Sequence, residues 1–446
     1  MQLAGDARLT ADIRFFWARL NANYWFYPAL FSLIAAALAF TMVGLDRSGF
    51  AEFLNDVSWI VPARPQGAAN MLTVMAGSMI GVASTVFSIT IAAVAYASGN
   101  YGPRLLTNFM EDRGNQLSLA TFIGSFVYAL IVLRAVRAED ETPSDVTDAV
   151  ATALPGFVPQ LSLLVAYLLM ALCVAVLVFF LNHIPSSIRI NKVLKGIGER
   201  LLDAIRETYP VEDEFRDALE PKGGKALTAW STGYVQMIDF EDLANVARDC
   251  GCTFSLRVRT GDLVHRDMPF MDIEGCEPEC IEARVRDCFT LGSTRTPEQD
   301  PQFLIDELVE IGLRALSPGI NDPFTAITAL HWLGAATAEI GRRDLRKDIC
   351  GEDAEDCPVI PLPDDFDHYV SRGFGAIRSA VASSPIAAEV MLDTLANAAV
   401  PIGDEARQAL LKDQAEKLAD QARLILVGPD LDQFERHVSE FSKTFW

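Results

Sequence analysis

Residues 160–182 read QLSLLVAYLLMALCVAVLVFFLN, and this run decides the fold because it contains no charged side chain. A helix needs about 20 mostly apolar residues to cross a bilayer. Three further runs, at about 24–45, 70–97 and 117–136, meet the same requirement. The sequence therefore predicts a domain of four transmembrane helices within residues 1–185.

The composition divides the chain into two unlike parts. Of 446 residues, 50% are hydrophobic and 22% are charged, with the long apolar runs before residue 185 and most of the charge after it. This division predicts a polytopic α-helical membrane protein with four transmembrane helices and a C-terminal α+β cytosolic domain containing a small β-rich module. The net charge of −22 argues against a nucleic-acid partner, because like charges repel.

Lysine and arginine residues beside the apolar runs predict the orientation. One side of the predicted membrane carries Arg8, Arg14, Arg19, Arg104, Arg113, Arg189, Lys192, Lys195 and Arg200. The opposite side carries only Arg47, Arg64 and Arg137. Because cytoplasmic loops are rich in Lys and Arg, both termini are expected in the cytoplasm, and the cysteines of the C-terminal half are expected to be reduced thiols.

The second apolar run differs from the others in its many small and hydroxyl side chains. They recur every three or four residues, which places them on one side of a helix: Ser78, Gly81, Ser84, Thr85 and Ser88. One interpretation is close helix packing in lipid, and the other is a polar lining of a water-filled path. The run has no ionisable residue, which favours a channel or scaffold over an ion-coupled carrier.

Residues 139–148, EDETPSDVTD, carry five acidic side chains and no basic one in a predicted outer loop. The simple interpretation is a solvated loop. In a symmetric oligomer the same loops would form a ring of negative charge, which concentrates cations at a pore mouth.

The polar half begins with an amphipathic linker helix within residues 186–230. A β-rich module at 231–290 follows, because GYVQMIDF alternates like a strand and Thr260-Gly261-Asp262 predicts a turn between two strands. From residue 277 onward the pattern predicts only helices, so 291–446 is expected to be a helical cytosolic region.

No motif in the chain predicts catalysis or a cofactor. Phosphate-binding, nucleophile-elbow and dinucleotide-binding patterns are absent, and the five histidines lie in no metal-binding pattern. Five cysteines lie at Cys250, Cys252, Cys276, Cys280 and Cys288. They lack the C-x2-C spacing of a zinc ribbon, which favours ordinary thiols over a metal site. We therefore expect no catalytic residues, no metal and no cofactor.

The stretch SPGINDPF, residues 317–324, predicts a helix end followed by a helix start. Ser317-Pro318-Gly319 can end one helix, while Asn321 or Asp322 can cap the next, with Pro323 in its first turn. The alternative is a fixed exposed loop at a ligand or subunit interface. Its candidate residues are Ser317, Gly319, Asn321, Asp322 and Thr325.

Several long phrases resemble one bacterial family of predicted membrane proteins, catalogued as domain of unknown function 2254. They are STVFSITIAAVAYASGNYGPRLLTNFMEDRGNQ (84–116), GYVQMID (233–239), VRTGDLVHRDMPF (258–270), RTPEQD (295–300) and LVEIGLRALSPGINDPFTAITAL (308–330). The resemblance covers roughly residues 20 to 430. It implies a multi-pass protein of the bacterial inner membrane with a conserved cytosolic domain, and it implies no activity.

Two function hypotheses remain open on these observations. The first is an oligomeric channel or pore, with cations as the favoured ions and the cytosolic domain as vestibule or gate. The alternative is a non-conducting membrane scaffold or sensor whose cytosolic domain binds a partner or small ligand. The expected partners are the lipid bilayer, further copies of the chain and ions, with no nucleic acid.

Overall fold

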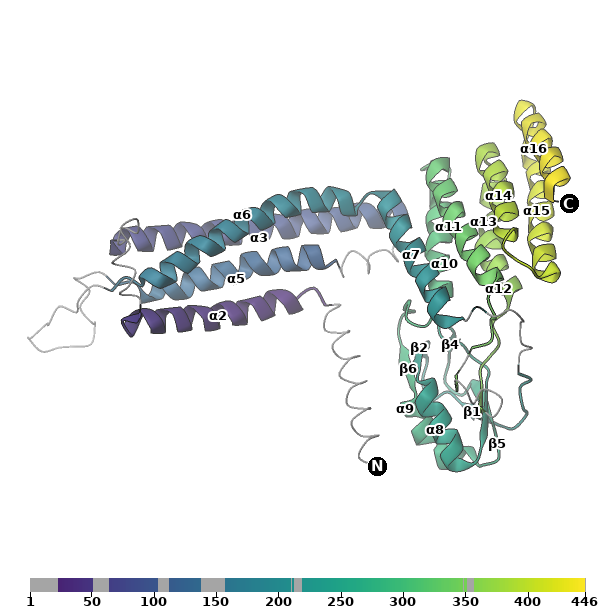
Figure 1. Ribbon diagram of the computed structural model, residues 1–446, viewed down its shortest axis with the longest axis horizontal. Helices are drawn as coiled ribbons and strands as arrows, with labels where there is room; N and C mark the ends of the chain where they lie inside the picture. Colours follow the sequence, from purple (N-terminus) through teal and green to yellow (C-terminus); the bar gives the residue numbers. More distant parts are fainter. Residues whose placement is uncertain are drawn as a thin grey trace, which may run out of the picture. The chain divides into compact units, whose positions relative to one another are not determined.

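A computed structural model describes residues 23–50, 64–102, 112–137, 157–209, 211, 219–347, 349–350 and 357–445. The chain forms two compact units (Figure 1). The first, called the membrane unit below, takes in residues 1–99 and 103–189, and the second, called the C-terminal unit, takes in residues 100–102 and 190–446. The acidic loop 139–148 lies outside the described residues.

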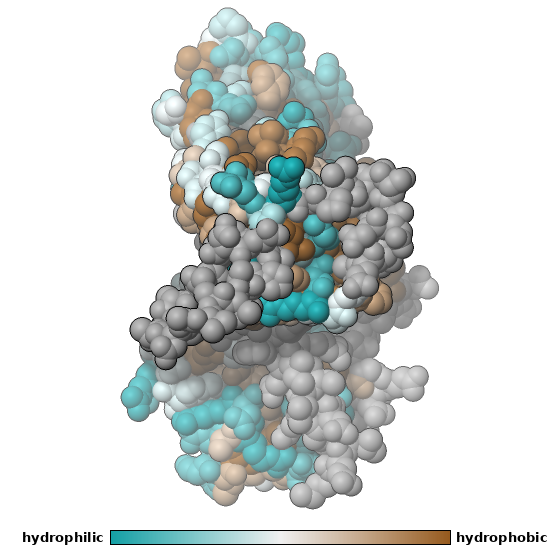
Figure 2. All heavy atoms as spheres, turned by 90° about the vertical axis from the view of Figure 1, so that its left-hand side faces the viewer, coloured by the Kyte–Doolittle hydropathy of each residue, from teal (hydrophilic) through white to brown (hydrophobic). Residues whose placement is uncertain are grey.

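The described part of the membrane unit is built from four helices, each long and apolar enough to cross a membrane. They are α2 (Phe26–Arg47), α3 (Pro65–Tyr101), α5 (Arg113–Ala135) and α6 (Gln160–Ser187). These helices correspond to the four predicted spans, although α3 and α6 extend beyond the predicted ends. Large hydrophobic side chains are exposed on all four helices. On the face of the molecule that Figure 2 shows, brown hydrophobic residues lie among teal hydrophilic ones.

Polar contacts fix both ends of the membrane unit. At one end the Asp46 carboxylate accepts hydrogen bonds from the backbone amides of Leu161 and Ser162, both at 2.9 Å, and so caps α6. At the other end Asp112 is the N-cap of α5, and His183 Nε2 lies 2.9 Å from its carboxylate. These contacts hold α6 to α2 at one end and to α5 at the other.

The β-rich part of the C-terminal unit contains two small sheets. The strands are β1 (Lys225–Thr228), β2 (Gly233–Ile238), β3 (Thr253–Leu256), β4 (Leu263–Val264), β5 (Pro269–Glu274), β6 (Phe289–Gly292) and β7 (Val359–Ile360). One sheet has the order β1-β5-β3-β7 and the other β4-β2-β6. Helices α8 (Phe240–Cys250) and α9 (Pro278–Asp287) lie beside them (Figure 1).

The rest of the C-terminal unit is helical. Its helices are α7 (Ile190–Thr208), α10 (Pro301–Ala315), α11 (Pro323–Gly341), α12 (Phe366–Val370), the π-helical turn η3 (Ser371–Gly375), α13 (Ala376–Val381), α14 (Pro385–Ala399), α15 (Glu405–Ile425) and α16 (Pro429–Phe445). The amphipathic helix predicted after the fourth span is α7, which buries Leu194, Ile197 and Leu201. It packs against α10 and α11.

The expectation that only helices follow residue 277 is wrong. β6 pairs with β2, and β7 pairs in parallel with β3 from more than 100 residues away in the chain. Both strands are short, and β7 has only two residues, so neither shows the alternation by which a strand is recognised in a sequence.

Candidate functional site

The segment RTPEQD, residues 295–300, forms a buried ion pair at the start of α10. Asp300 is the N-cap of α10, and its Oδ1 accepts a hydrogen bond from the Phe303 amide at 3.2 Å. Its Oδ2 accepts two bonds from the Arg295 guanidinium, at 3.1 and 2.5 Å. Asp300 is only 2% exposed. Burial raises the pKa of Asp300, and the Arg295 charge opposes this rise without cancelling it.

Arg295 also connects Asp300 to a second acidic side chain. Its Nη1 donates to Asp306 at 2.7 Å, and Asp306 accepts two further bonds from Arg372 at 2.6 and 2.7 Å. Arg372 lies in η3, and π-helical turns occur frequently at functional sites. We call Arg295, Asp300, Asp306 and Arg372 the charged joint.

The charged joint is connected to the β-rich part through its neighbours. The Gln299 side chain accepts from the Ile238 amide at 3.0 Å and donates to the Ile238 carbonyl at 3.2 Å. The Thr260 hydroxyl donates to the Gln299 carbonyl at 2.5 Å. A Cβ on Gly261 would lie 2.2 Å from Asp300 Oδ2, and Gly261 has a φ of +92°, so this turn requires glycine.

A second buried polar cluster is centred on Asp364, and we call it the Asp364 cluster. The carboxylate accepts from the Tyr209 hydroxyl at 2.6 Å and forms ion pairs with Lys347 at 3.0 Å and Arg259 at 3.3 Å. The Tyr209 and Tyr369 hydroxyls lie 2.7 Å apart. Burial raises the pKa of both phenols, so both remain protonated and able to donate hydrogen bonds at neutral pH.

His368 is affected by the charges of both clusters. Its Nε2 lies 3.1 Å from the Gln302 side-chain oxygen. Burial lowers the pKa of His368, and the positive charges of Arg259 and Arg372 lower it further. The imidazole is therefore neutral at pH 7.

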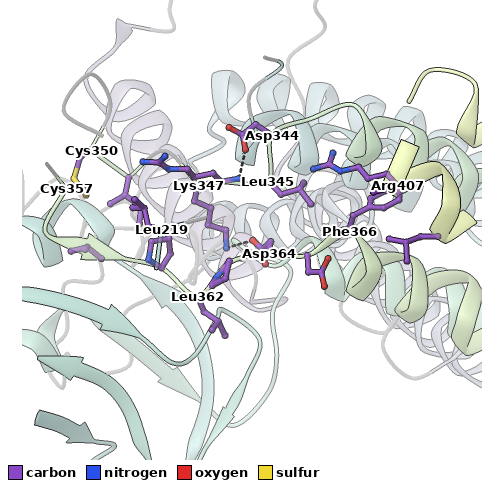
Figure 3. Close-up of a pocket in the computed structure, with 18 residues that line it drawn as sticks. Leu219, Asp344, Leu345, Lys347, Cys350, Cys357, Leu362, Asp364, Phe366 and Arg407 are labelled. Atoms are coloured by element: carbon purple, nitrogen blue, oxygen red, sulfur yellow. Dashed lines mark hydrogen bonds and ion pairs between the residues drawn. A yellow bond between two sulfur atoms is a disulfide. The ribbon is translucent and has the colours of Figure 1, made fainter. Parts of the chain in front are cut away.

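The Asp364 cluster borders a cavity of about 530 Å³ (Figure 3). Lys347 and Asp364 lie on its wall with Leu362, and Arg407 and Phe366 lie farther along it. The Arg407 guanidinium is 5.5 Å from the Phe366 ring centre and donates to the Arg343 carbonyl at 2.8 Å. A cavity of this size, apolar with a few fixed charges, is suited to a small ligand.

The family described as "Predicted membrane protein (DUF2254)" matches residues 21–397. The chain belongs to this family. An uncharacterized protein of Mycobacterium bovis is 29% identical over 362 residues, which are 78% of this chain and 67% of the relative. An uncharacterized protein of Mycobacterium tuberculosis matches with the same identity and coverage. No solved structure matches the chain.

Membership of the DUF2254 family confirms the resemblance seen in the sequence. Its description supports a membrane protein, in agreement with the four apolar helices, and it assigns no activity. The segments RTPEQD and VRTGDLVHRDMPF, on which the resemblance partly rests, lie close together in the structure. They supply Arg295, Asp300 and the Thr260–Gly261 turn at the charged joint.

The SPGINDPF stretch of this DUF2254 protein is a turn between α10 and α11, as predicted. Asp322 is the N-cap of α11, and its carboxylate accepts from the Thr325 amide at 3.2 Å and the Thr325 hydroxyl at 2.6 Å. The Ser317 hydroxyl donates to the Arg314 carbonyl. Gly319 and Asn321 are exposed. The capping interpretation is confirmed, whereas a ligand or subunit contact at these residues stays a prediction.

Replacing Asp322 with alanine is expected to lower the free energy of unfolding by about 1 kcal/mol, because the Thr325 amide in the first turn of α11 loses the carboxylate that caps it. Chemical denaturation of the full chain in detergent measures this change. The matched control is Asp322→Asn, which keeps a capping oxygen and should lose only a few tenths of that amount. If Asp322→Ala instead dissociated an oligomer at unchanged stability, the residue would be a subunit contact.

The small residues of the second span lie on the outside of the membrane unit. Ser78, Gly81, Ser84, Thr85 and Ser88 are all exposed on α3. A Cβ on Gly81 would meet no atom within 4 Å. The described residues of the chain's own bundle therefore do not cover this face.

Four cysteines of the C-terminal unit lie in two pairs. Cys350 and Cys357, which border the cavity, are joined by a disulfide, so the expectation that the cysteines of the C-terminal half are reduced thiols is wrong for this pair. Cys252 and Cys276 are free thiols with their sulfurs 2.7 Å apart. Among the described residues, no group of three or more His, Cys, Asp or Glu side chains is placed to hold a metal ion.

Sequence reasoning missed the Asp364 cluster and the part that Arg372 has in the charged joint. Tyr209 and Asp364 are 155 residues apart in the chain, and Arg372 and Asp306 are 66 apart. No spacing rule joins such residues. The available signal was weaker: RTPEQD contains one basic and two acidic residues next to a predicted helix start.

Proposed function

We propose that this DUF2254 protein is a homo-oligomeric membrane channel in which α3 helices of neighbouring subunits line the conducting path. The observation that carries the proposal is the exposed row Ser78, Gly81, Ser84, Thr85 and Ser88 on α3. Hydroxyl groups and bare glycine backbone are poor partners for lipid tails. A second copy of the chain, or water held between copies, suits them better.

The position of the bulky side chains on α3 supports the same proposal. A helix turns about 100° per residue, so Ile80 and Phe87 flank the small residues on one side, and Ile89 and Tyr96 on the other. All four are exposed. A narrow polar strip between apolar margins is the pattern of a helix that contacts other subunits along its margins and water along its centre.

The hydroxyl groups of the strip are oriented in a way that favours cations. Thr85 donates its proton to the Gly81 carbonyl at 3.0 Å, and Ser88 donates to the Ser84 carbonyl at 2.8 Å. Each hydroxyl oxygen therefore keeps its lone pairs for another partner. Oxygen lone pairs without a fixed charge can replace part of the hydration shell of a cation.

In this proposal the protein lies in the bacterial inner membrane with both termini in the cytoplasm. The C-terminal unit forms a vestibule or gate, and its partners are lipid, other copies of the chain and ions. The net charge of −22 supports cations as the ions and opposes nucleic acid. No residue is assigned a catalytic role.

Cation flux into liposomes containing the purified protein tests the proposal. Thr85→Leu and Ser88→Leu are each expected to reduce the cation flux by about tenfold or more, because apolar side chains in a narrow pore exclude the water that ions need. Thr41→Leu is the matched control, since Thr41 is an exposed, internally bonded hydroxyl on α2. Absence of flux under voltage, tension and pH change would overturn the channel.

A non-conducting sensor or scaffold is the second candidate, and the cavity beside Asp364 favours it. A fixed Lys347–Asp364 ion pair on an apolar wall is suited to recognise a polar group of a small ligand. Native mass spectrometry of the purified protein distinguishes the candidates. A retained small molecule that is lost in Lys347→Ala, together with no flux, would support the sensor.

A further inference from the structure

Three thiols meet at one end of the four-stranded sheet. Cys252 follows Gly251, which ends α8, and it immediately precedes β3. Cys276 lies two residues beyond the end of β5. Because β3 and β5 are antiparallel and Thr253 pairs with Glu274, the two cysteines are brought together where these strands end. Cys250, the last residue of α8, also contacts the Cys252 thiol.

The sulfur separation indicates which chemistry suits the pair. The Cys252 and Cys276 sulfurs are 2.7 Å apart. Two thiolates on a tetrahedral zinc ion lie about 3.8 Å apart for Zn–S bonds of about 2.3 Å. Sulfurs in a disulfide are about 2.05 Å apart. The two sulfurs are therefore in direct contact and need only a small movement to form a covalent bond.

We propose that Cys252 and Cys276 form a thiol–disulfide exchange site whose substrate is a low-molecular-weight disulfide of the glutathione type. Cys276 is the entry thiol because it is half-buried, whereas Cys252 is 4% exposed and cannot meet a bulky reagent first. Cys252 is the resolving thiol, in contact with the sulfur that it must attack.

The exchange proceeds in two balanced steps. The Cys276 thiolate attacks one sulfur of the small disulfide, which forms a mixed disulfide and releases one small thiolate. Cys252 then loses its proton to water and attacks Cys276 Sγ, which forms the Cys252–Cys276 disulfide and releases the second small thiolate. The two released thiolates take up the two protons lost by the protein thiols, so two protein thiols are oxidised and one small disulfide is reduced.

The surroundings of Cys252 slow its reaction at neutral pH. Burial, followed by the hydrogen bond with Cys276 and the nearby Cys276 and Cys250 thiols, raises the pKa of Cys252 to about 12. The thiolate is the nucleophile, so the second step is the slow one at neutral pH. The disulfide, once formed, would link the start of β3 covalently to the end of β5. Both strands belong to the four-stranded sheet that also contains β7.

Peptide mapping after oxidation tests the proposal. The full-length protein in detergent is incubated with glutathione disulfide and then unfolded in acid and denaturant, the free thiols are alkylated in the unfolded chain, and each cysteine is followed by mass spectrometry. We expect the wild type to lose alkylation at Cys252 and Cys276 and to yield a peptide linking them. Cys252→Ala should abolish the link and retain glutathione on Cys276.

Two further variants keep the test decisive. Cys276→Ala changes a half-buried thiol, so it should fold even if Cys252→Ala does not, and it should also abolish the link. Cys280→Ser removes an exposed thiol outside the pair and should form the link at the wild-type rate. A wild type that acquires glutathione on Cys280 while Cys252 and Cys276 remain fully alkylated would overturn the proposal.

Discussion

Arg295→Ala is expected to lower the free energy of unfolding of the C-terminal unit by about 3–5 kcal/mol, which is the usual cost of leaving a buried charge without its partner. Arg295 supplies two hydrogen bonds to Asp300 and one to Asp306. Asp306 keeps its two hydrogen bonds from Arg372, whereas Asp300 keeps its bond from the Phe303 amide and the more distant charge of Arg372. The larger part of the loss therefore comes from Asp300, which is 2% exposed.

The loss should depend on pH in a defined direction. Burial already raises the pKa of Asp300 in the folded protein, and removing the Arg295 charge raises it further. A folded pKa above the unfolded value contributes stability below the unfolded pKa, and this contribution is lost as pH rises through the folded pKa. The variant should therefore recover part of its stability in acid, where Asp300 is neutral in both states.

Denaturant titration of the full chain in detergent, followed by tryptophan fluorescence, measures both effects. The control is Lys417→Ala, which breaks the exposed Lys417–Asp413 pair on α15 and should cost no more than about 1 kcal/mol. Equal losses in the two variants would mean that the Arg295 pair behaves like a surface ion pair, contrary to its burial.

The parts of this fold that were predictable from sequence are those whose signals are local. A long apolar helix is a continuous apolar run, and a helix cap is a short pattern. The helices α2, α3, α5 and α6 and the Asp322 cap were therefore predicted correctly as structural elements. α7 was recognisable by its 3.6-residue period, which places Leu194, Ile197 and Leu201 on its buried face.

The parts that escaped prediction depend on partners far away in the chain. β7 is a strand only because Val359 and Ile360 pair with Phe254 and Ser255, and two residues carry no period of their own. The residues next to Asp364 in the sequence form no motif that predicts a buried carboxylate. Its burial among Tyr209, Lys347 and Arg259 arises from tertiary packing. A hydrophobic pattern identifies the face of an element that is buried, but it does not identify the polar groups that will meet there.

Gly198→Ala is expected to destabilise the C-terminal unit by about 1–3 kcal/mol, because an added methyl group overfills a packed interface. A Cβ at this position would lie 2.2 Å from the Trp332 ring, where α7 packs against α11. The contact is with ring atoms near the attachment point of the side chain, so a small side-chain rotation does not relieve it.

Gly196→Ala is the matched control for this prediction, since it makes the same substitution two residues earlier in the same helix. A Cβ on Gly196 meets nothing within 4 Å, so alanine there should stabilise α7 by about 0.5–1 kcal/mol through its better helix propensity. The two variants therefore should shift the denaturation midpoint in opposite directions. Because both gain the same propensity, the difference between them isolates the cost of the methyl group against Trp332. A stabilised Gly198→Ala protein would contradict the prediction, because it would mean that the interface between α7 and α11 accommodates the added methyl group without cost.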